Sequence, residues 1–528
     1  MIKEPLHKVL LRVEDKINRL LGKLKKLAVI SNETYNELYT SGSTPGILYG
    51  LPKLHKLFVP IRPIFAACGT PTYKLAKYLV PLLSCLTEDE FTIKNSYSFV
   101  SDLQTFEMPP NGVMASFDIE SLFTNIPVKE TIEICIQSLF SGTNTVKGFT
   151  KDLFRSILEL AVLNSYFLFD SKLYKQDDGV GMGLPLGPTF ANIFLCFHEK
   201  KWLDDCPVEF RPKYFRRYVD DCFLVFNDQS HIDRFLHYLN GRHPKIKFTK
   251  EVEKNGILAF LDVNISKDGS RLSTSVYRKP SFTGLGLSYF SSIPKTVKFA
   301  VIKSSIFRAF TLCSSYKSFD SELGFLKTFF RNNGFPIYLV NSCINNFLNQ
   351  KYSNTLPLFN VPKLKRFFVL PYFGEQSQGM QKEMIELLSS FYPYLDPRIV
   401  LRNTLTVGSF FHFKDRVPKA CRSGVIYKYC CSSCGEAYIG STHVRLKTRV
   451  AQHLGISDRT GKMTLTPSHS SIRDHKQTCD SPVTIDDFTI IGRSSIEADL
   501  RLLESLHIHE NKPSLNNKFS AVPLNIVS

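Results

Sequence analysis

The apolar positions change their spacing along the chain and so divide it into segments. Residues 1–40 place apolar side chains at intervals of three and four, as an amphipathic helix does, and the turn-rich stretch TSGSTPG follows. Strand-like and helical runs then alternate to about residue 290. The pattern predicts a multidomain α+β protein with five segments: an N-terminal helical segment (1–45), a mixed segment (46–294), a basic helical segment (295–370), a connector with scattered Gly and Pro (371–420) and a small α+β unit (421–520).

Two stretches of the mixed segment place carboxylates at the ends of apolar strands. VMASFDIESLFTNIP (113–127) predicts a strand that ends at Asp118 and is followed by a helix. RRYVDDCFLVF (216–226) predicts a hairpin whose turn holds Asp220 and Asp221. An Asp-Asp pair alone usually marks an ordinary turn, so its meaning depends on its neighbours.

Carboxylates that gather at one point repel one another and are costly to desolvate. Divalent cations remove this penalty, and two of them about 3.5 to 4 Å apart stabilise the attacking and leaving oxygens of phosphoryl transfer. If the hairpin turn lies beside the strand of Asp118, two or three carboxylates gather there and predict a metal-dependent phosphoryl-transfer site.

The positive charge of the chain is concentrated in the basic helical segment. The formal net charge is +18, and residues 295–370 hold many Lys and Arg but only two acids, Asp320 and Glu322. Aromatic side chains lie between these cations, a combination that suits a phosphate backbone and exposed bases. The alternative is a solvated surface on an ordinary core.

No apolar run reaches the roughly 20 residues that a bilayer crossing needs. The richest run, LELAVLNSYFLF (158–169), predicts a core helix, and the N-terminus lacks the apolar core of a signal peptide. These features predict a soluble, intracellular protein with no membrane partner.

Five of the thirteen cysteines lie between residues 421 and 479. In a protein without a secretory signal, such a cluster favours a metal site over disulfides. Cys431 and Cys434 have ligand spacing, and His475 and Cys479 lie four apart on one helical face, which together predict a structural Zn²⁺ site. Cysteines packed as small apolar side chains are the alternative. Two further cysteines are candidate ligands: Cys430, in place of Cys431, and Cys421.

The motifs of the mixed segment, taken in order, resemble those of reverse transcriptases, and among these the Penelope-like retroelements, whose polymerase is related to telomerase. This resemblance implies a right-hand polymerase with fingers, palm and, over 295–370, a helical thumb. The likeness is carried by YGLPKLHK (49–56), PIRPIFAACGTPTYKLAKYL (60–79), SFDIESLFTNIP (116–127), GVGMGLPLGPTFANIFL (179–195), RYVDD (217–221), FTKEVEKNGILAFLDVNI (248–265) and VYRKPSFTG (276–284).

The resemblance also implies roles for single residues. Asp118 and Asp220 would be the principal ligands of Mg²⁺ or Mn²⁺, with Asp221 beside them. Phe123 would crowd the sugar 2′ position and so favour dNTPs, although it also reads as a core residue. Gly187 closes the Gly-rich run that lets the backbone approach the primer and base pair. The cations expected to hold the triphosphate are Arg62 with Lys53 or Lys56.

The last segment resembles the GIY-YIG nuclease domain, which Penelope-like elements carry after the polymerase, often with a Cys/His finger inserted. The likeness rests on GVIYKYCCSSCGEAYIG (424–440), RLKTRVAQH (445–453) and RLLESLHIHENKPSLNN (501–517), and the first run has Val where the family has Gly. The implied roles are as follows: Tyr427 as general base with Tyr438 as its partner, Arg449 at the scissile phosphate with His453 on the same helical face, Glu504 at one divalent cation, and Asn516 in local structure, with Arg445 as a competing phosphate contact.

Together the resemblances imply a retroelement protein that acts in the nucleus. Its nuclease would nick DNA, and its polymerase would extend the freed 3′-OH while copying the element's RNA, so that its partners are template RNA, target and primer DNA, and dNTPs. Family members generally carry a longer N-terminal region, so a short or truncated copy is expected. A nucleic-acid-binding descendant without activity and a telomerase-like cellular enzyme are the two alternatives. The oligomeric state is left open by the sequence.

Overall fold

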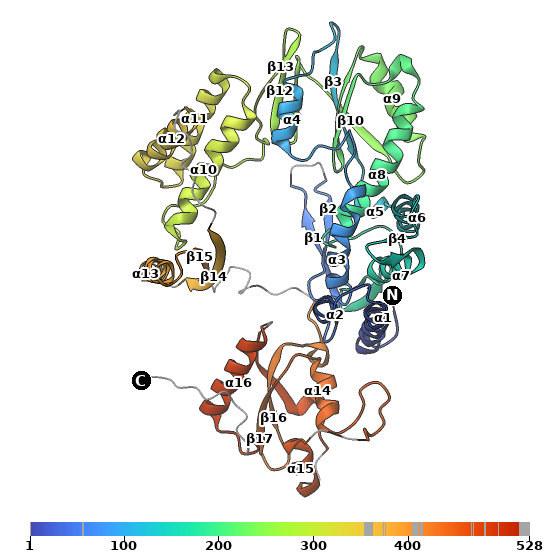
Figure 1. The fold of residues 1–528 in the computed structure, drawn as a ribbon, viewed down its shortest axis with the longest axis vertical. Coiled ribbons are helices and arrows are strands. Elements are labelled where there is room, and N and C mark those ends of the chain that lie inside the picture. The colour runs from blue at the N-terminus through green and yellow to red at the C-terminus, as the bar shows by residue number, and fades with distance from the viewer. Residues whose placement is uncertain are drawn as a thin grey trace. The chain divides into compact units, whose positions relative to one another are not determined.

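The computed structural model describes residues 2–54, 58–352, 363–372, 374, 376–403, 411, 415–465, 467, 469–479, 482–494 and 496–516. The chain divides into two units, each made of separate stretches of sequence. The first unit comprises residues 1–89, 121–201 and 413–528, and the second comprises 90–120 and 202–412. Both combine helices with strands, as expected for a mixed α and β protein (Figure 1).

The N-terminal part of the first unit surrounds a four-stranded sheet of order β2-β1-β6-β7. Helix α8 begins in this unit and runs on past residue 201. The elements are α1 (Leu6–Lys26), α2 (Asn32–Leu38), β1 (Gly46–Pro52), β2 (Ile61–Ala66), α3 (Tyr73–Leu83), α5 (Leu122–Asn125), α6 (Val128–Leu139), β4 (Thr145–Val146), β5 (Phe149–Thr150), α7 (Lys151–Val162), β6 (Tyr166–Phe169), β7 (Lys172–Lys175) and α8 (Gly187–Asp204).

The expected helix at the start of the chain is present as α1, and its apolar stripe is buried. Val9 packs against Leu168 and Leu173 of the β6–β7 hairpin. The expected core helix over 158–169 is wrong in its second half. Helix α7 ends at Val162, and β6 follows, because Tyr, Phe, Leu and Phe in succession suit a pleated strand.

The second unit contains the expected strand and hairpin of the carboxylates in one sheet of order β10-β3-β9-β8. A three-stranded sheet, β11-β12-β13, faces it across α4. The elements are α4 (Ser96–Leu103), β3 (Val113–Ile119), β8 (Tyr214–Tyr218), β9 (Asp221–Phe226), α9 (Ser230–Asn240), β10 (Phe248–Val252), β11 (Ile257–Phe260), β12 (Val263–Asp268) and β13 (Arg271–Val276).

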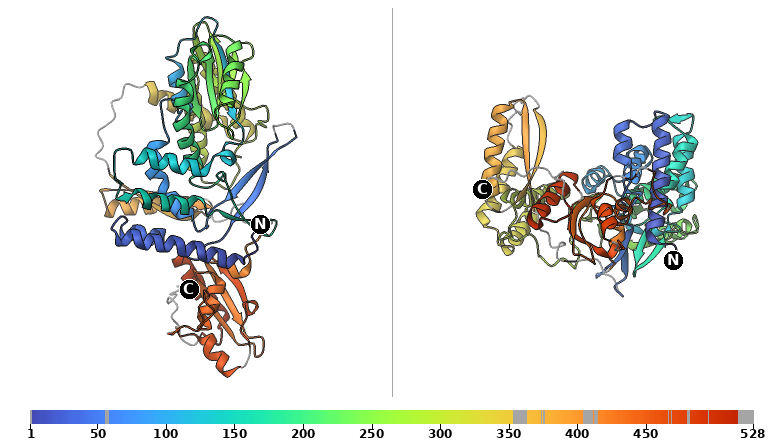
Figure 2. Two further views of the ribbon diagram at one scale, coloured as in Figure 1. Left: turned by 90° about the vertical axis from the view of Figure 1, so that its right-hand side faces the viewer. Right: turned by 90° about the horizontal axis from the view of Figure 1, so that it is seen from below.

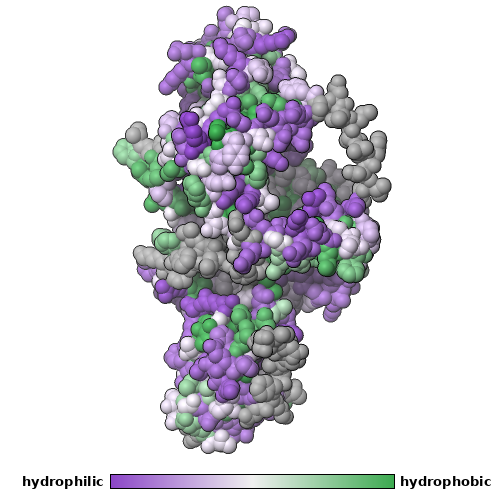
Figure 3. All heavy atoms as spheres, turned by 90° about the vertical axis from the view of Figure 1, so that its left-hand side faces the viewer, coloured by the Kyte–Doolittle hydropathy of each residue, from purple (hydrophilic) through white to green (hydrophobic). Residues whose placement is uncertain are grey.

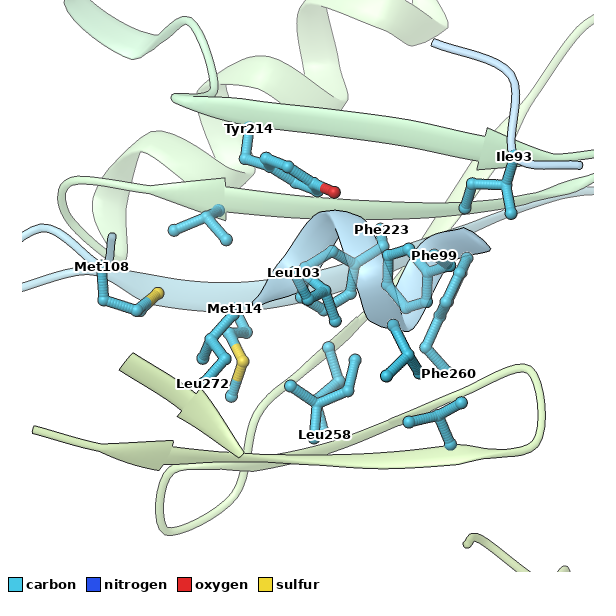
Figure 4. Close-up of a cluster of buried hydrophobic side chains, with 14 of the residues drawn as sticks. Ile93, Phe99, Leu103, Met108, Met114, Tyr214, Phe223, Leu258, Phe260 and Leu272 are labelled. Atoms are coloured by element: carbon cyan, nitrogen blue, oxygen red, sulfur yellow. The ribbon is translucent and has the colours of Figure 1, made fainter. Parts of the chain in front are cut away.

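The core of this unit fills the space between the two sheets (Figure 4). Phe99 of α4 contacts Phe223 of β9 and Phe260 of β11, with ring centroids 5.3 and 5.1 Å away. Five consecutive residues of β9, Cys222 to Phe226, are buried, so both faces of this strand are covered. The strand that begins at Asp221 is therefore rigidly held.

Residues 295–352 of the basic helical segment form three helices around their own apolar core: α10 (Lys295–Leu312), α11 (Tyr316–Asn332) and α12 (Ile337–Tyr352). The helical prediction is wrong at the end of the segment, where Leu364–Tyr372 forms strand β14. Arg278 joins the three helices to the end of β13, because its guanidinium donates to the buried Glu322 carboxylate of α11 and lies 3.7 Å from the ring centroid of Phe325.

The connector expected over 371–420 instead contains regular structure. A parallel pair of strands, β14 (Leu364–Tyr372) and β15 (Leu395–Asn403), is joined by helix α13 (Gln376–Phe391). Two of the prolines in this stretch, Pro371 and Pro397, lie within the two strands. A two-stranded sheet consists of edge strands, and edge strands tolerate proline.

The C-terminal part of the first unit is a small α/β domain with a sheet of order β17-β16-β18. Figure 2 shows the N-terminal helix beside this domain. The elements are β16 (Val425–Cys430), β17 (Ala437–Thr442), α14 (Leu446–His453), α15 (Ser471–Thr478), β18 (Phe488–Arg493) and α16 (Glu497–Asn511).

Hydrophilic side chains predominate on the face drawn in Figure 3, with hydrophobic ones scattered among them. Within the part of the chain that the structure describes, no helix has both the length and the apolar character to cross a membrane.

Candidate active sites

The structure brings Asp118 and Asp221 together on neighbouring strands. They are directly opposite each other in the antiparallel register of β3 and β9, and the Ile119 N–H donates to the Asp220 carbonyl at 2.9 Å. Side chains of such a pair stand on the same face, with Cβ atoms about 4.5 to 5.5 Å apart. All three carboxyl groups are half-buried, so a ligand can still reach them.

The turn between β8 and β9 differs from the expected one. Tyr218 pairs with Asp221, so the two turn residues are Val219 and Asp220, and Asp221 already belongs to β9. Val219 has a φ of 56°, a left-handed conformation that a β-branched residue rarely adopts. The fully buried Arg217 donates to the Val219 carbonyl at 3.2 Å. Strain of this kind persists where the surroundings fix the backbone, as they do at functional sites.

This arrangement fits divalent cations. Carboxylate oxygens are the ligands that Mg²⁺ and Mn²⁺ prefer, and facing carboxylates repel until a cation lies between them. The register thus makes Asp118 and Asp221 cross-strand neighbours, and Asp220 directly precedes Asp221 in the turn. The sequence reading ranked Asp220 above Asp221, and the register makes Asp221 the direct neighbour.

The structure also brings Phe123 and Gly187 together, in the first unit. A Cβ on Gly187 would lie 3.7 Å from the Phe123 ring, and the Val180 N–H donates to the Phe123 carbonyl at 2.7 Å. Gly183 has a φ of 114°, and a Cβ there would lie 2.3 Å from the Phe65 carbonyl oxygen. The Gly-rich run therefore packs closely on β2 and α5, where only glycine fits.

The expected triphosphate cations lie on the hairpin of β1 and β2. Arg62 is exposed and pairs with Leu51 across the strands. Lys53 is half-buried, and its N–H donates to the Pro60 carbonyl at 2.9 Å. Lys56 lies outside the described residues.

A second candidate site lies on the C-terminal domain, around the buried phenol of Tyr427. Its Oη is 2.7 Å from His453 Nε2 and accepts a hydrogen bond from Arg449 Nε at 3.2 Å. Burial raises the pKa of Tyr427, and burial with the nearby Arg449 lowers the pKa of His453 to about 3. Both groups are therefore neutral in the free protein. A Cβ on Gly440 would lie 2.7 Å from the Tyr427 Oη, so glycine there leaves room for the phenol.

The other residues expected at this site lie on the same sheet and on α16. Tyr438 is half-buried, its ring centroid 6.4 Å from that of Tyr427, and burial raises its pKa. The half-buried Glu504 accepts hydrogen bonds from the Ser441 N–H at 3.1 Å and from its hydroxyl at 2.5 Å. Each carboxylate oxygen keeps a lone pair, which fits a cation ligand. Glu504 also contributes to the raised pKa of Tyr427, after the larger effect of burial.

Asn516 is hydrogen-bonded to β17 through its side chain. Its side chain accepts from the Ile439 N–H and donates to the Ile439 carbonyl, both at 2.8 Å. These two bonds hold the chain after α16 against β17.

Arg445, the competing phosphate contact, is not available for that role. It is 1% exposed, and its Nη2 lies 2.6 Å from the Glu14 carboxylate of α1, which is 4% exposed. Arg445 also donates to the carbonyl and hydroxyl of Ser43 at 3.1 and 3.0 Å. Sequence reasoning missed this contact, since 431 positions separate the partners. Arg449 is therefore the phosphate candidate.

The expected zinc ligands converge. One ligand atom from each of Cys431, Cys434, His475 and Cys479 lies within 4.8 Å of the others. The sulfurs of Cys431 and Cys479 are 3.8 Å apart, and a tetrahedral Zn²⁺ with bonds of about 2.3 Å separates two sulfurs by about 3.8 Å. A disulfide would need about 2.05 Å. The His475 hydrogen bond lowers the pKa of Cys431 to about 5, which favours the thiolate that binds metal.

Two family models match the chain. Residues 61–287 match the model described as reverse transcriptase (RNA-dependent DNA polymerase), so the chain contains a reverse transcriptase domain. This stretch includes the carboxylates of β3 and β9. Residues 286–345 match the model described as animal helix-turn-helix domain, and they include α10, α11 and most of α12. No curated protein matches the chain.

Solved structures show only distant similarity. Telomerase from Candida albicans, in complex with a TWJ fragment of telomeric RNA, is 13% identical over 69% of this chain and 66% of its own, with a TM-score of 0.42. Apo telomerase from Candida tropicalis, truncated from its C-terminal domain, is 14% identical over 44% of this chain and 55% of its own, with a TM-score of 0.35. The RNA-dependent RNA polymerase 3Dpol of Sicinivirus is 11% identical over 60% of this chain and 71% of its own, with a TM-score of 0.39.

Proposed function

We propose that the chain is a retroelement protein of the Penelope-like kind, which copies RNA into DNA and nicks the DNA from which synthesis starts. The facing carboxylates Asp118 and Asp221 carry the polymerase part, because they lie inside the stretch that matches the reverse transcriptase family. The match supports RNA-directed DNA polymerase activity. Its setting would be the nucleus, where chromosomal DNA is available.

In the polymerase, Asp118, Asp220 and Asp221 would hold the divalent cations. Bound there, Mg²⁺ supplies charge stabilisation for the attacking 3′ oxygen and the leaving pyrophosphate. Phe123, packed beside Gly187, would exclude a 2′-hydroxyl, and Arg62 with Lys53 would hold the triphosphate of the incoming dNTP. Lys56 stays in this proposal on sequence grounds alone.

The C-terminal domain would be a GIY-YIG endonuclease with a structural Zn²⁺ in its Cys/His cluster. The hydrogen-bonded set of Tyr427, His453 and Arg449 supports this proposal, with Glu504 beside it as the ligand of one divalent cation. The cation would supply charge stabilisation at the phosphate. Arg449 would contact the same phosphate.

The cleavage step can be written with all atoms placed. A water oxygen bonds to phosphorus, and the bond from phosphorus to the 3′ oxygen breaks. The proton of that water passes to the Tyr427 oxygen, whose own hydrogen passes to His453 Nε2 across 2.7 Å. The 3′ oxygen takes a proton from solvent, which leaves a 3′-hydroxyl and a 5′-phosphate. The 3′-hydroxyl is the primer that the polymerase needs.

The three basic helices would grip the template–primer duplex as a thumb. Their match to a helix-turn-helix model and their excess of Lys and Arg support contact with a phosphate backbone. A nick and a primer made by one chain keep the new 3′ end at high effective concentration.

The experiment is primer extension on an RNA template with dNTPs and Mg²⁺, by the purified wild type and an Asp118→Ala variant. Extension by the wild type alone supports the polymerase proposal. A plasmid-nicking assay of the wild type and Glu504→Ala tests the nuclease in the same preparation. Template binding without extension or nicking would overturn both parts and favour a protein that only binds nucleic acid.

A further inference from the structure

A chain of hydrogen bonds leads from the Tyr427 phenol to the start of helix α15. Tyr427 Oη is 2.7 Å from His453 Nε2, and His453 Nδ1 is 2.7 Å from the hydroxyl oxygen of Ser470. All three residues are buried, with exposed fractions of 0%, 4% and 5%. Ser470 has no role in the chemistry proposed above, yet its hydroxyl is the side-chain partner of His453 Nδ1.

One direction of these bonds agrees with the role of Ser470 at the helix. Ser470 is the N-cap of α15, and its hydroxyl oxygen accepts from the Arg473 N–H at 3.4 Å. The same oxygen has a second lone pair, which can accept from a His453 ring whose Nδ1 carries the hydrogen. The lone pair of the imidazole is then on Nε2, where it faces Tyr427.

The contacts of Tyr427, at the other end of this series of hydrogen bonds, agree with this proton arrangement. Arg449 Nε can only donate, so the Tyr427 oxygen accepts from it at 3.2 Å. The Tyr427 hydrogen is then free to be donated to His453 Nε2. This arrangement of protons satisfies every bond from Arg449 to Ser470.

Helix α15 also carries half of the Cys/His cluster. His475 lies within the helix and Cys479 caps its end, while Cys431 and Cys434 come from the turn between β16 and β17. A helix of eight residues is too short to be stable alone, so its position depends on such tertiary ties. The cluster ties the far end of α15 to the sheet that carries Tyr427.

We propose that Ser470 is a positioning residue that sets the tautomer of His453, and that the Cys/His cluster keeps Ser470 in place by holding α15. The consequence for cleavage rests on the proposed nuclease function. The hydrogen bonds and the tautomer of His453 do not depend on that function, and they can be measured without a nuclease assay. A Zn²⁺ ion in the cluster would thereby act on the chemistry of Tyr427 without contacting it.

The test compares two substitutions of Ser470 in the full chain. Ser470→Gly removes the hydroxyl but keeps the helix start, since glycine at an N-cap costs only a few tenths of a kcal/mol. Ser470→Thr keeps both the hydroxyl and the cap. The ¹⁵N spectrum of histidine side chains reports the His453 tautomer, and His453→Gln identifies its signals.

We expect Nδ1–H in the wild type and in Ser470→Thr, and a shift toward the other tautomer in Ser470→Gly. The kcat of nicking should fall about 10- to 100-fold in Ser470→Gly, as for other residues that orient a functional histidine. Its KM should stay within about twofold, because Arg449 still contacts the phosphate. Primer extension and zinc content should equal those of the wild type, which shows that the chain is folded.

The cluster is tested by His475→Ala in the same chain. Loss of zinc should shift the His453 signals in the direction seen for Ser470→Gly, with primer extension retained. Unchanged His453 signals in Ser470→Gly overturn the role of Ser470. Unchanged signals in zinc-free His475→Ala overturn the role of the cluster.

Different results would overturn the nuclease function and the positioning role of Ser470. A wild type that never nicks DNA overturns the proposed nuclease, while a shifted tautomer in Ser470→Gly still supports the positioning role. A wild type that nicks DNA, with kcat and tautomer equal in Ser470→Gly, overturns the positioning role alone.

Discussion

Asp118 and Asp221 face each other across neighbouring antiparallel strands, on the same side of the sheet. Like charges directly opposite each other destabilise a sheet by roughly 0.2 to 1 kcal/mol. A cation bound by both carboxylates would remove this repulsion, since carboxylate oxygens are ligands that divalent cations prefer.

The first prediction separates activity from stability at this pair. Asp118→Asn keeps the shape of the side chain but removes one charge, so primer extension should fall at least about 10³-fold, while the free energy of unfolding rises by about 0.2 to 1 kcal/mol. Extension assays and urea unfolding measure both. Asp205→Asn, an exposed residue of the same unit, should change neither. A less stable variant with full activity would contradict the metal role.

The second prediction concerns the strained turn. Val219→Gly relieves a left-handed conformation that costs about 1 to 3 kcal/mol, against an entropy cost of about 0.5 to 1 kcal/mol. Stability should therefore be equal or higher, and extension should be slower because Asp220 is held less firmly. Val225→Gly, in the buried part of β9, should cost about 3 kcal/mol. Equal losses in the two variants would show that the turn is not strained.

The sequence predicted the carboxylate strands because each has a local apolar pattern, and it predicted the Cys/His cluster because each half has a local spacing. It did not predict the pairing of Asp221 with Asp118. That register depends on a two-residue turn, and Val219 gives no turn signal because valine is disfavoured there. The β14–α13–β15 unit was missed for a similar reason, since prolines in edge strands resemble those of a connector.

The role of Arg445 shows the limit of motif reading. By sequence it is as good a phosphate contact as Arg449, four positions away. Its burial against Glu14 is decided by the docking of α1, and no local pattern records a contact over 431 positions. Long-range polar contacts of this kind need the folded structure.

The third prediction tests this buried ion pair. Glu14→Ala leaves the Arg445 charge buried without its carboxylate, which costs about 3 to 5 kcal/mol, and Arg445→Met should be similarly harmful. The double variant Glu14→Met with Arg445→Met should recover most of the loss. Hydrogen exchange at the amides of α14 measures the loss of stability in each variant. Asp15→Ala breaks the more exposed pair with Arg459 and should cost under about 1 kcal/mol. Additive single losses would show that the two charges do not interact.

The last prediction uses the lowered pKa of His453. Burial, with the nearby Arg449, holds that pKa at about 3, below the ordinary value of 6.5. Between these values the unfolded chain binds a proton that the folded chain excludes, so stability falls as the pH drops below about 6.5. The contribution of one such group is at most about 1.4 kcal/mol per pH unit.

His453→Gln removes the titrating group, so its free energy of unfolding should depend less steeply on pH between about 6 and 4 than that of the wild type. Urea unfolding of the C-terminal domain, monitored through hydrogen exchange at α14 and β16, gives the free energy of unfolding at each pH. The slope of this free energy against pH is then compared between the variants. His509→Gln changes an exposed histidine of the same domain and should keep the wild-type slope. Equal slopes for the wild type and His453→Gln would mean that the ring is protonated in the folded protein. It would then have no lone pair to offer Tyr427, and the hydrogen-bonded chain to Ser470 would have to run in another direction.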